Sequence, residues 1–127
     1  MKLRTINAPD APQPVGGYAQ AVEVSAASRL LFVSGQVPVD VDGAVPTDFE
    51  SQARLCFRNI VAQLAAAGMT LDNLVQLRVY LARESDVGDY RRIRNEVLAG
   101  RQVASTTVKG GVFGQVWLLE VEATAAA

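Results

Sequence analysis

The chain contains no histidine, which removes imidazole as a catalytic base, a catalytic acid or a metal ligand. Its single cysteine, Cys56, cannot form an internal disulfide, and zinc would have to be held by carboxylates alone. The sequence therefore predicts no metal site. Any catalysis has to rest on carboxylates, hydroxyls, backbone groups, arginine or lysine.

Other absences narrow the class of protein and its partners. The formal net charge of −1 provides no basic field for phosphate backbones, so we expect no nucleic-acid partner. No uncharged apolar run approaches the roughly 18 residues of a membrane span, and the N-terminus lacks the apolar core of a signal peptide. We therefore expect a cytoplasmic protein without membrane contact. Half of the 127 residues are apolar, which is enough for one globular domain, residues 1–127.

The most informative run of the sequence is Leu30–Pro38, in which branched and aromatic residues precede Ser34-Gly35-Gln36. Continuous apolar runs of this kind indicate a strand buried on both faces. Pro38 ends the strand because proline has no N–H to donate. Two interpretations remain open: the small polar residues line a binding cleft, or a core strand simply runs into a turn.

A first helix is predicted after Thr47. Thr47 and Glu50 have the spacing of a capping box, and Gly68 suits a left-handed C-terminal cap. Its apolar residues recur every three or four positions and form one stripe: Phe49, Ala53, Cys56, Phe57, Ile60 and Leu64. Cys56 lies on this stripe, so we interpret it as a core residue and not as a nucleophile.

The remaining patterns predict further strands and one more helix. The strands are expected at residues 3–6, 18–24, 74–81, 105–108 and 116–123, beside the strand at 30–38. The second helix starts near Asp86 and is capped by Gly100. It is expected to point apolar residues such as Tyr90 inward and its arginines mostly outward: Arg91, Arg92 and Arg94.

The element order is then β-β-β-α-β-α-β-β, which indicates an α+β fold with two helices on one face of a single sheet. Two helices leave the other face of that sheet uncovered. This face is expected to carry both apolar and charged side chains: Arg78, Tyr80, Val116, Leu118, Glu120 and Glu122. Monomeric proteins rarely leave such a face bare in water, so we expect a homo-oligomer with polar clefts between its subunits.

Several motifs, taken in chain order, resemble the YjgF/RidA family. They are Gly17–Ala21, Phe32–Pro38, Gln52-Ala53 with Asn59, Val75–Leu81 and Leu119–Ala123. The resemblance implies a chorismate-mutase-like fold assembled as a homotrimer, with a central barrel and small-molecule clefts between subunits. It also implies hydrolysis of reactive enamines and imines to 2-keto acids and ammonia, with no cofactor or metal. An older label for this family is endoribonuclease L-PSP.

The resemblance assigns roles to residues of this chain. Tyr18 matches the family's cleft tyrosine, and Ser34 with Gly35 matches its cleft wall. Glu120 matches the carboxylate that positions the hydrolytic water, and would pass a proton between water and the imine nitrogen. From the residues alone, Glu120 also fits a carboxylate paired with Arg78 across the sheet, and this alternative stays open.

One departure from the family pattern affects the substrate. Ser105 stands where active members carry an arginine that grips the substrate carboxylate, and serine cannot make that two-pronged charged contact. Its loss costs on the order of 2–5 kcal/mol, so turnover of 2-imino acids should be weak or absent. Under one hypothesis Arg91 or Lys109 supplies a replacement cation; under the other, Arg91 lies on a solvated helix face.

Three functions follow from these observations. The first is hydrolytic deamination of an enamine or imine, with an activity that Ser105 weakens or alters. The second is a non-catalytic trimer that binds a small imino, enamino or keto acid in its clefts. The third, RNA cleavage, is the least favoured because the chain lacks histidine and an excess of basic charge.

Overall fold

A computed structural model describes all 127 residues and shows the predicted order of strands and helices. Two short 3₁₀ turns, Leu71–Asn73 and Glu84–Asp86, precede β4 and α2. The main elements are β1 (Lys2–Ile6), β2 (Ala21–Ser25), β3 (Leu30–Gln36), α1 (Phe49–Ala66), β4 (Leu74–Leu81), α2 (Val87–Leu98), β5 (Ala104–Lys109) and β6 (Leu119–Ala126).

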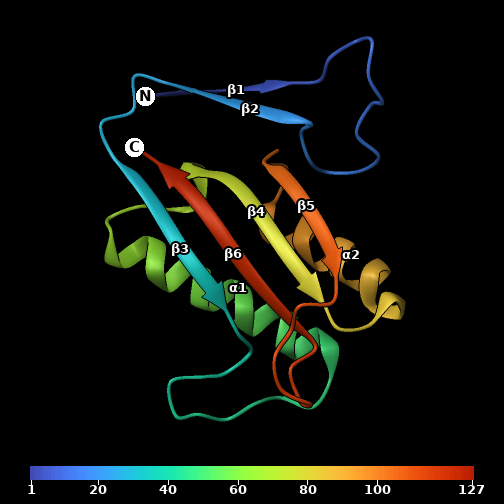
Figure 1. The fold of residues 1–127 in the computed structure, drawn as a ribbon. Coiled ribbons are helices and arrows are strands. Elements are labelled where there is room, and N and C mark those ends of the chain that lie inside the picture. Colours follow the sequence, from blue (N-terminus) through green and yellow to red (C-terminus); the bar gives the residue numbers. More distant parts are fainter.

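The main sheet has four strands in the order β3-β6-β4-β5. The β4–β5 pair is parallel and the other two pairs are antiparallel. Both helices lie on one face of this sheet, and the opposite face is open (Figure 1). The predicted α+β fold with helices on one face is therefore confirmed.

The prediction of a single sheet is wrong, because β1 and β2 form a separate antiparallel hairpin. The hairpin lies across the end of the main sheet at which β6 finishes and β4 begins (Figure 1). Ala26, which follows β2, has a left-handed φ of 55° and turns the chain away from β2. The next backbone bonds go from Ser28 and Arg29 to the carbonyl of Ala127, so β3 pairs with β6 and not with β2.

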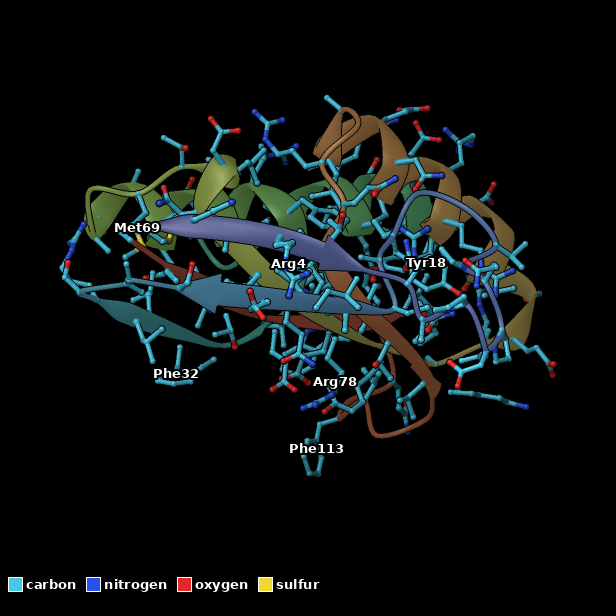
Figure 2. The ribbon with its side chains drawn as sticks, turned by 90° about the horizontal axis from the view of Figure 1, so that it is seen from above. Arg4, Tyr18, Phe32, Met69, Arg78 and Phe113 are labelled. Atoms are coloured by element: carbon cyan, nitrogen blue, oxygen red, sulfur yellow. The ribbon has the colours of Figure 1, made fainter.

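Strand β3 is an edge strand, and the prediction that it is buried on both faces is wrong for the protomer. Val33 is buried beneath the helices, but Leu30 and Phe32 are 60% and 74% exposed. Phe32 projects to the side away from the helices, together with Arg78 and Phe113 (Figure 2). An unbroken apolar run does not distinguish a doubly buried strand from an edge strand with one uncovered face.

Helix α1 begins one residue later than the capping-box spacing predicts. Asp48, not Thr47, is the N-cap, and its carboxylate accepts a hydrogen bond from the Ser51 N–H at 2.9 Å. Gly68 follows the helix with a left-handed φ of 69°, as predicted. The predicted apolar stripe is confirmed, because all of its residues lie in the core: Phe49, Ala53, Cys56, Phe57, Ile60 and Leu64.

Burial explains the chemical state of the single cysteine. Cys56 is fully buried in the core on α1, and desolvation raises the pKa of its thiol to about 12. The thiol therefore stays protonated at neutral pH, and its interpretation as a core residue is confirmed.

Helix α2 buries an arginine that the sequence pattern placed outside. Arg94 is only 3% exposed and lies on the same helix face as the buried Tyr90 and Leu98. The outward prediction for Arg94 is wrong, because these three residues recur at a spacing of four, which aligns them on one face. Arg91 and Arg92 are exposed, as predicted.

The segment before β6 is held by a buried amide. Gln52 donates hydrogen bonds to the carbonyls of Pro46 and Val116, at 2.7 and 2.8 Å, and accepts one from the Leu118 N–H at 2.8 Å. Strand β6 begins only at Leu119, so Val116 and Leu118 do not lie on the open face as strand residues. Leu118 instead packs against the core, and the prediction for these two residues is wrong.

No helix of the structure combines the length and apolar character that crossing a membrane requires.

Candidate functional site

Three of the predicted site residues meet in one cavity at the β5 edge of the sheet. Tyr18, Arg91 and Ser105 line it, and its volume is about 400 Å³. We call it the β5 cavity, and its lining residues come from the N-terminal loop, α2 and β5: Val15, Tyr18, Arg91, Arg94, Ser105 and Thr107.

The N-terminal loop reaches this cavity because two glycines let it lie close to α2. A Cβ atom on Gly17 would stand 2.7 Å from the Asn95 side-chain oxygen, closer than such contacts occur. Gly16 has a φ of 120°, which residues other than glycine rarely adopt. Beyond them, the Ala19 N–H donates to the Val103 carbonyl at 2.9 Å, which ties the loop to the start of β5. Tyr18 is thereby fixed at the cavity wall.

The cavity is cationic. Arg91 and Arg94 both line it, and neither forms an ion pair with a carboxylate. Burial lowers the pKa of Arg94 from its ordinary value, and the neighbouring charge of Arg91 acts in the same direction. The Ser105 Oγ is buried and has no hydrogen-bond partner. The β5 cavity thus offers hydrogen-bond donors to a negatively charged group.

Lys109 does not take part in this cavity. It lies near Glu84, with 3.6 Å between the ammonium nitrogen and a carboxylate oxygen, and lines a neighbouring hollow with Arg91. Of the two cations proposed to replace the family arginine, only Arg91 reaches the cavity beside Ser105.

Sequence reasoning missed Arg94 as a lining residue. The signal that could have found it is the spacing Tyr90-Arg94-Leu98, which puts the arginine on an otherwise buried stripe of α2. The prediction instead placed the arginines of this helix mostly on its outer face.

A second group of predicted residues lies on the open face, where β3 meets β6. We call it the Glu120 cluster: Ser34, Gly35 and Glu120. A Cβ atom on Gly35 would collide with the Glu120 carboxylate, so only glycine allows this side chain its position. The ladder between β3 and β6 shifts register here, between Val33 and Gln36.

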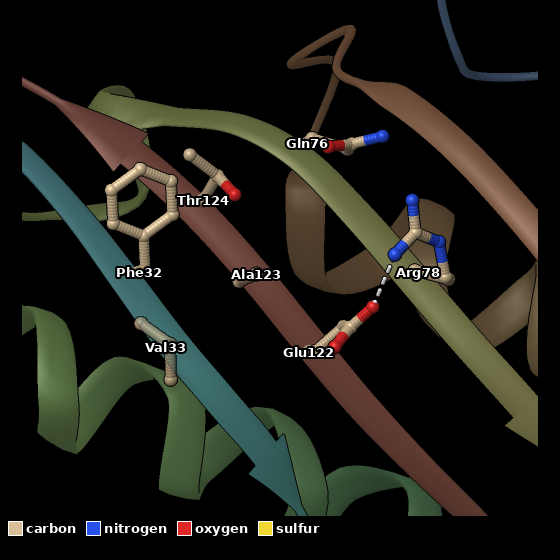
Figure 3. A pocket seen from close by; sticks show the side chains of 7 residues that line it. All are labelled: Phe32, Val33, Gln76, Arg78, Glu122, Ala123 and Thr124. Atoms are coloured by element: carbon tan, nitrogen blue, oxygen red, sulfur yellow. Dashed lines mark hydrogen bonds and ion pairs between the residues drawn. The ribbon is translucent and has the colours of Figure 1, made fainter.

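The two glutamates of β6 differ in their contacts. Glu122 accepts a hydrogen bond from the Arg78 guanidinium at 2.6 Å (Figure 3). It accepts another from the Tyr80 hydroxyl at 3.2 Å. This contact raises the pKa of Arg78. The Glu120 carboxylate forms neither a hydrogen bond nor an ion pair within the protomer. Glu122, and not Glu120, is therefore the carboxylate that pairs with Arg78.

The register of the sheet places the β5 cavity and the Glu120 cluster on opposite faces. Ser105 lies beside Leu77, which is fully buried beneath the helices. Glu120 lies beside Tyr80, whose hydroxyl reaches across the open face. Because paired residues of adjacent strands point to the same face, the sheet separates Ser105 from Glu120. One protomer therefore does not bring all the predicted site residues together.

The structure contains no group of three or more histidine, cysteine, aspartate or glutamate side chains arranged to hold a metal ion.

The fold and the motifs on it define the class of protein. The chain belongs to the family described as endoribonuclease L-PSP, whose model matches residues 8–127. The predicted membership in the YjgF/RidA family is thereby confirmed.

Individual relatives are similar over most of the chain. A RutC family protein of Pyrococcus horikoshii is 32% identical over 118 residues, which are 91% of each chain. TdcF of Escherichia coli, named as a reactive intermediate deaminase, is 35% identical over 88 residues, or 68% of this chain and 63% of TdcF.

Solved structures show the same fold. YyfB of Yersinia pestis, a Rid family protein of unknown function, superposes with a TM-score of 0.86 at 27% identity, covering 100% of both chains. The structure of E. coli TdcF with bound serine gives a TM-score of 0.72 at 26% identity, covering 98% of both chains.

Proposed function

We propose that this protein hydrolyses small enamines or imines in sites that form between the subunits of a homotrimer. The observation that carries this proposal is the division of the predicted site into two complementary halves. The β5 cavity is cationic, and the Glu120 cluster provides an unpaired carboxylate. Each half alone lacks what the other supplies.

A ring of identical subunits would join the two halves. In a cyclic trimer each subunit presents one surface to one neighbour and a different surface to the other. The β5 edge of one subunit can then face the Glu120 cluster of the next. The open face suits such an interface, because Leu30 and Phe32 leave an apolar area uncovered in the single protomer.

Glu120 is the group suited to the chemical step. With no hydrogen-bond or ion-pair partner, its carboxylate is free to accept a proton from a water molecule. The water oxygen bonds to the imine carbon while its first proton passes through Glu120 to the nitrogen, which gives a carbinolamine. The hydroxyl proton then passes to the nitrogen as the C–N bond breaks, which releases ammonia and leaves a keto group. An enamine enters the same sequence after tautomerising to the imine.

The relatives favour a small substrate. TdcF is named as a reactive intermediate deaminase, and its structure holds serine, a ligand of a few heavy atoms. A cavity of about 400 Å³ is in the size range of small-molecule sites. For this chain we therefore propose a short imino or enamino acid and no separate cofactor.

The alternative is a trimer that binds a small imino, enamino or keto acid without turning it over. The observation that favours it is Ser105, which stands at the position of the family's substrate-binding arginine. RNA cleavage is the least favoured function, since the chain has no histidine and a net charge of −1.

The test is an assay in which a pyridoxal-phosphate dehydratase generates 2-aminoacrylate in situ and pyruvate release is followed. We expect the protein to accelerate pyruvate formation over the uncatalysed hydrolysis. Glu120→Gln should reduce that acceleration by a factor of about 10²–10⁴, the usual contribution of a general acid–base. Glu122→Gln is the matched control, since this glutamate shares the strand and the face but is already paired with Arg78.

A rate equal to the uncatalysed one would contradict the hydrolase and favour the metabolite-binding trimer. Equal losses in Glu120→Gln and Glu122→Gln would show that neither carboxylate acts specifically. Sedimentation of the wild-type protein as a monomer at micromolar concentration would remove the proposed intersubunit site.

A further inference from the structure

Arg94 is a buried charge without a counter-charge. It is only 3% exposed, and its guanidinium donates to one acceptor, the Asn95 side-chain oxygen, at 3.1 and 3.2 Å. Ion pairs in this structure involve seven other cationic side chains, none of which is Arg94: Arg4, Arg54, Arg78, Arg83, Arg92, Arg101 and Lys109. Buried charges in proteins are normally paired, so Arg94 is an exception that needs a reason.

Two aromatic rings hold the guanidinium in place. Its central carbon lies 5.6 Å from the centre of the Tyr18 ring and 6.0 Å from that of Tyr90. Such cation–π contacts fix the orientation of the guanidinium plane, but they leave N–H donors unused. The arginine is therefore oriented in advance and not fully satisfied by the protomer.

The unused donors belong to a cavity wall. Arg94 lines the β5 cavity, and so does Ser105, whose buried Oγ has no hydrogen-bond partner. Arg91, also without an ion pair, lines the same cavity from the preceding turn of α2. A planar guanidinium with a neighbouring hydroxyl matches the two oxygens of a carboxylate.

We propose that Arg94, assisted by Ser105 and Arg91, binds the carboxylate of a short 2-keto or 2-imino acid in the β5 cavity. The Tyr18 ring and Val15 provide an apolar wall for the remainder of such a ligand. The chain thus carries its substrate-binding arginine on α2, because Ser105 on β5 cannot supply one. The identity of the ligand rests on the proposed function, whereas the anion site rests on the unpaired arginine.

Pyruvate is the probe for this site, and methyl pyruvate is its uncharged counterpart. We expect the wild-type protein to bind pyruvate in preference to methyl pyruvate, by NMR titration or calorimetry. Arg94→Gln should weaken pyruvate binding on the order of 30-fold or more and leave methyl pyruvate unaffected. Arg58→Gln is the control, since Arg58 is also an unpaired arginine but lies exposed on α1.

A structural role for Arg94 would give a different pattern. Loss of a structural arginine would lower the melting temperature, whereas removing an unpaired buried charge should leave it unchanged or raise it. In the Arg94→Gln background, Ser105→Arg should restore part of the preference for pyruvate, because it returns a guanidinium to the same cavity.

Several outcomes would overturn the site. They are equal pyruvate affinity in wild type and Arg94→Gln, no preference over methyl pyruvate, and tighter binding of inorganic phosphate than of pyruvate. Hydrolysis of 2-aminoacrylate that survives Arg94→Gln would overturn this site and leave the proposed function standing. Arg94-dependent pyruvate binding in a protein that does not hydrolyse 2-aminoacrylate would support this site and contradict the proposed function.

Discussion

Along each strand of the four-stranded sheet the side chains alternate between two faces, and these faces differ in what covers them. On the helix side, Leu77 and Val79 are fully buried beneath α1 and α2. On the open side, Phe32 is 74% exposed and the main polar contact is the Arg78–Glu122 pair. The helix side is covered within one chain, whereas the open side is uncovered in the protomer and, under the proposed function, is covered by another subunit.

The same contrast divides the candidate site. The β5 cavity is enclosed by elements of one chain and contains a buried cation, Arg94. The Glu120 cluster lies on the uncovered face and contains an unpaired carboxylate. Stability should therefore respond mainly to changes in the apolar core beneath the helices, and assembly to changes on the open face, whereas activity should depend on both halves of the site.

A pair of phenylalanines gives the largest expected difference between the faces. Phe57→Ala removes a ring that stacks on Tyr90 in the core, with centroids 6.3 Å apart, and should destabilise the fold by about 3–5 kcal/mol. Phe32→Ala should change the unfolding free energy of the dissociated protomer by less than about 0.5 kcal/mol but weaken self-association. Urea unfolding and sedimentation measure the two effects. Equal destabilisation by both variants would contradict the distinction between the faces.

Gly35 tests the geometry of the open face. Gly35→Ala should displace the Glu120 carboxylate, because the added methyl group would collide with it. We expect loss of most of the hydrolytic rate with a preserved far-UV circular dichroism spectrum. Gly43→Ala is the control for the general cost of replacing a glycine. A Cβ there meets no neighbouring atom, and only its φ of 86° lowers the stability of the variant. Full activity in Gly35→Ala would show that the position of Glu120 does not matter.

Cys56 tests whether the core beneath the helices is closed to reagents in solution. Its thiol pKa is raised to about 12 by burial, so the reactive thiolate is scarce at pH 7–8. We expect a thiol reagent such as iodoacetamide to label the native protein slowly and the urea-unfolded protein rapidly. Thr124→Cys, on the open face, should label readily in the dissociated protomer. Rapid native labelling of Cys56 would mean that the core opens.

The Arg78–Glu122 pair should give the smallest effect on stability. Both side chains are partly solvent-exposed, and exposed ion pairs contribute little. Folding raises the pKa of Arg78, so the charged pair persists from neutral pH up to strongly basic pH and should add no pH dependence there. Glu122→Gln should shift the urea midpoint only slightly. A large shift would mean that the open face is covered in the protomer.

Sequence reasoning predicted the elements that depend on local pattern. The stripe of α1 follows from spacings of three and four residues and its cap from Gly68, and the structure agrees at these positions. The separate β1–β2 hairpin was not predictable in this way, because it depends on one left-handed residue, Ala26. The edge position of β3 was missed because strand order is a property of the whole chain.

The candidate site was predictable in its residues but not in its arrangement. Motif resemblance selected Tyr18, Ser105 and Glu120, yet only the strand register shows that the sheet separates Ser105 from Glu120. Arg94 was missed because charged residues on a helix are usually solvated, and its burial depends on the loop that carries Tyr18.

The most direct test of a site shared between subunits is complementation by mixed trimers. Arg94→Gln and Glu120→Gln subunits, each inactive alone, are refolded together in equal amounts and assayed with 2-aminoacrylate. If the halves come from different subunits, about one quarter of the sites regain both intact halves. As a control, wild type mixed with the double variant should also keep about one quarter of its sites, against about one half if each subunit acts alone. No recovery in the first mixture, with half the activity kept in the second, would contradict the shared site.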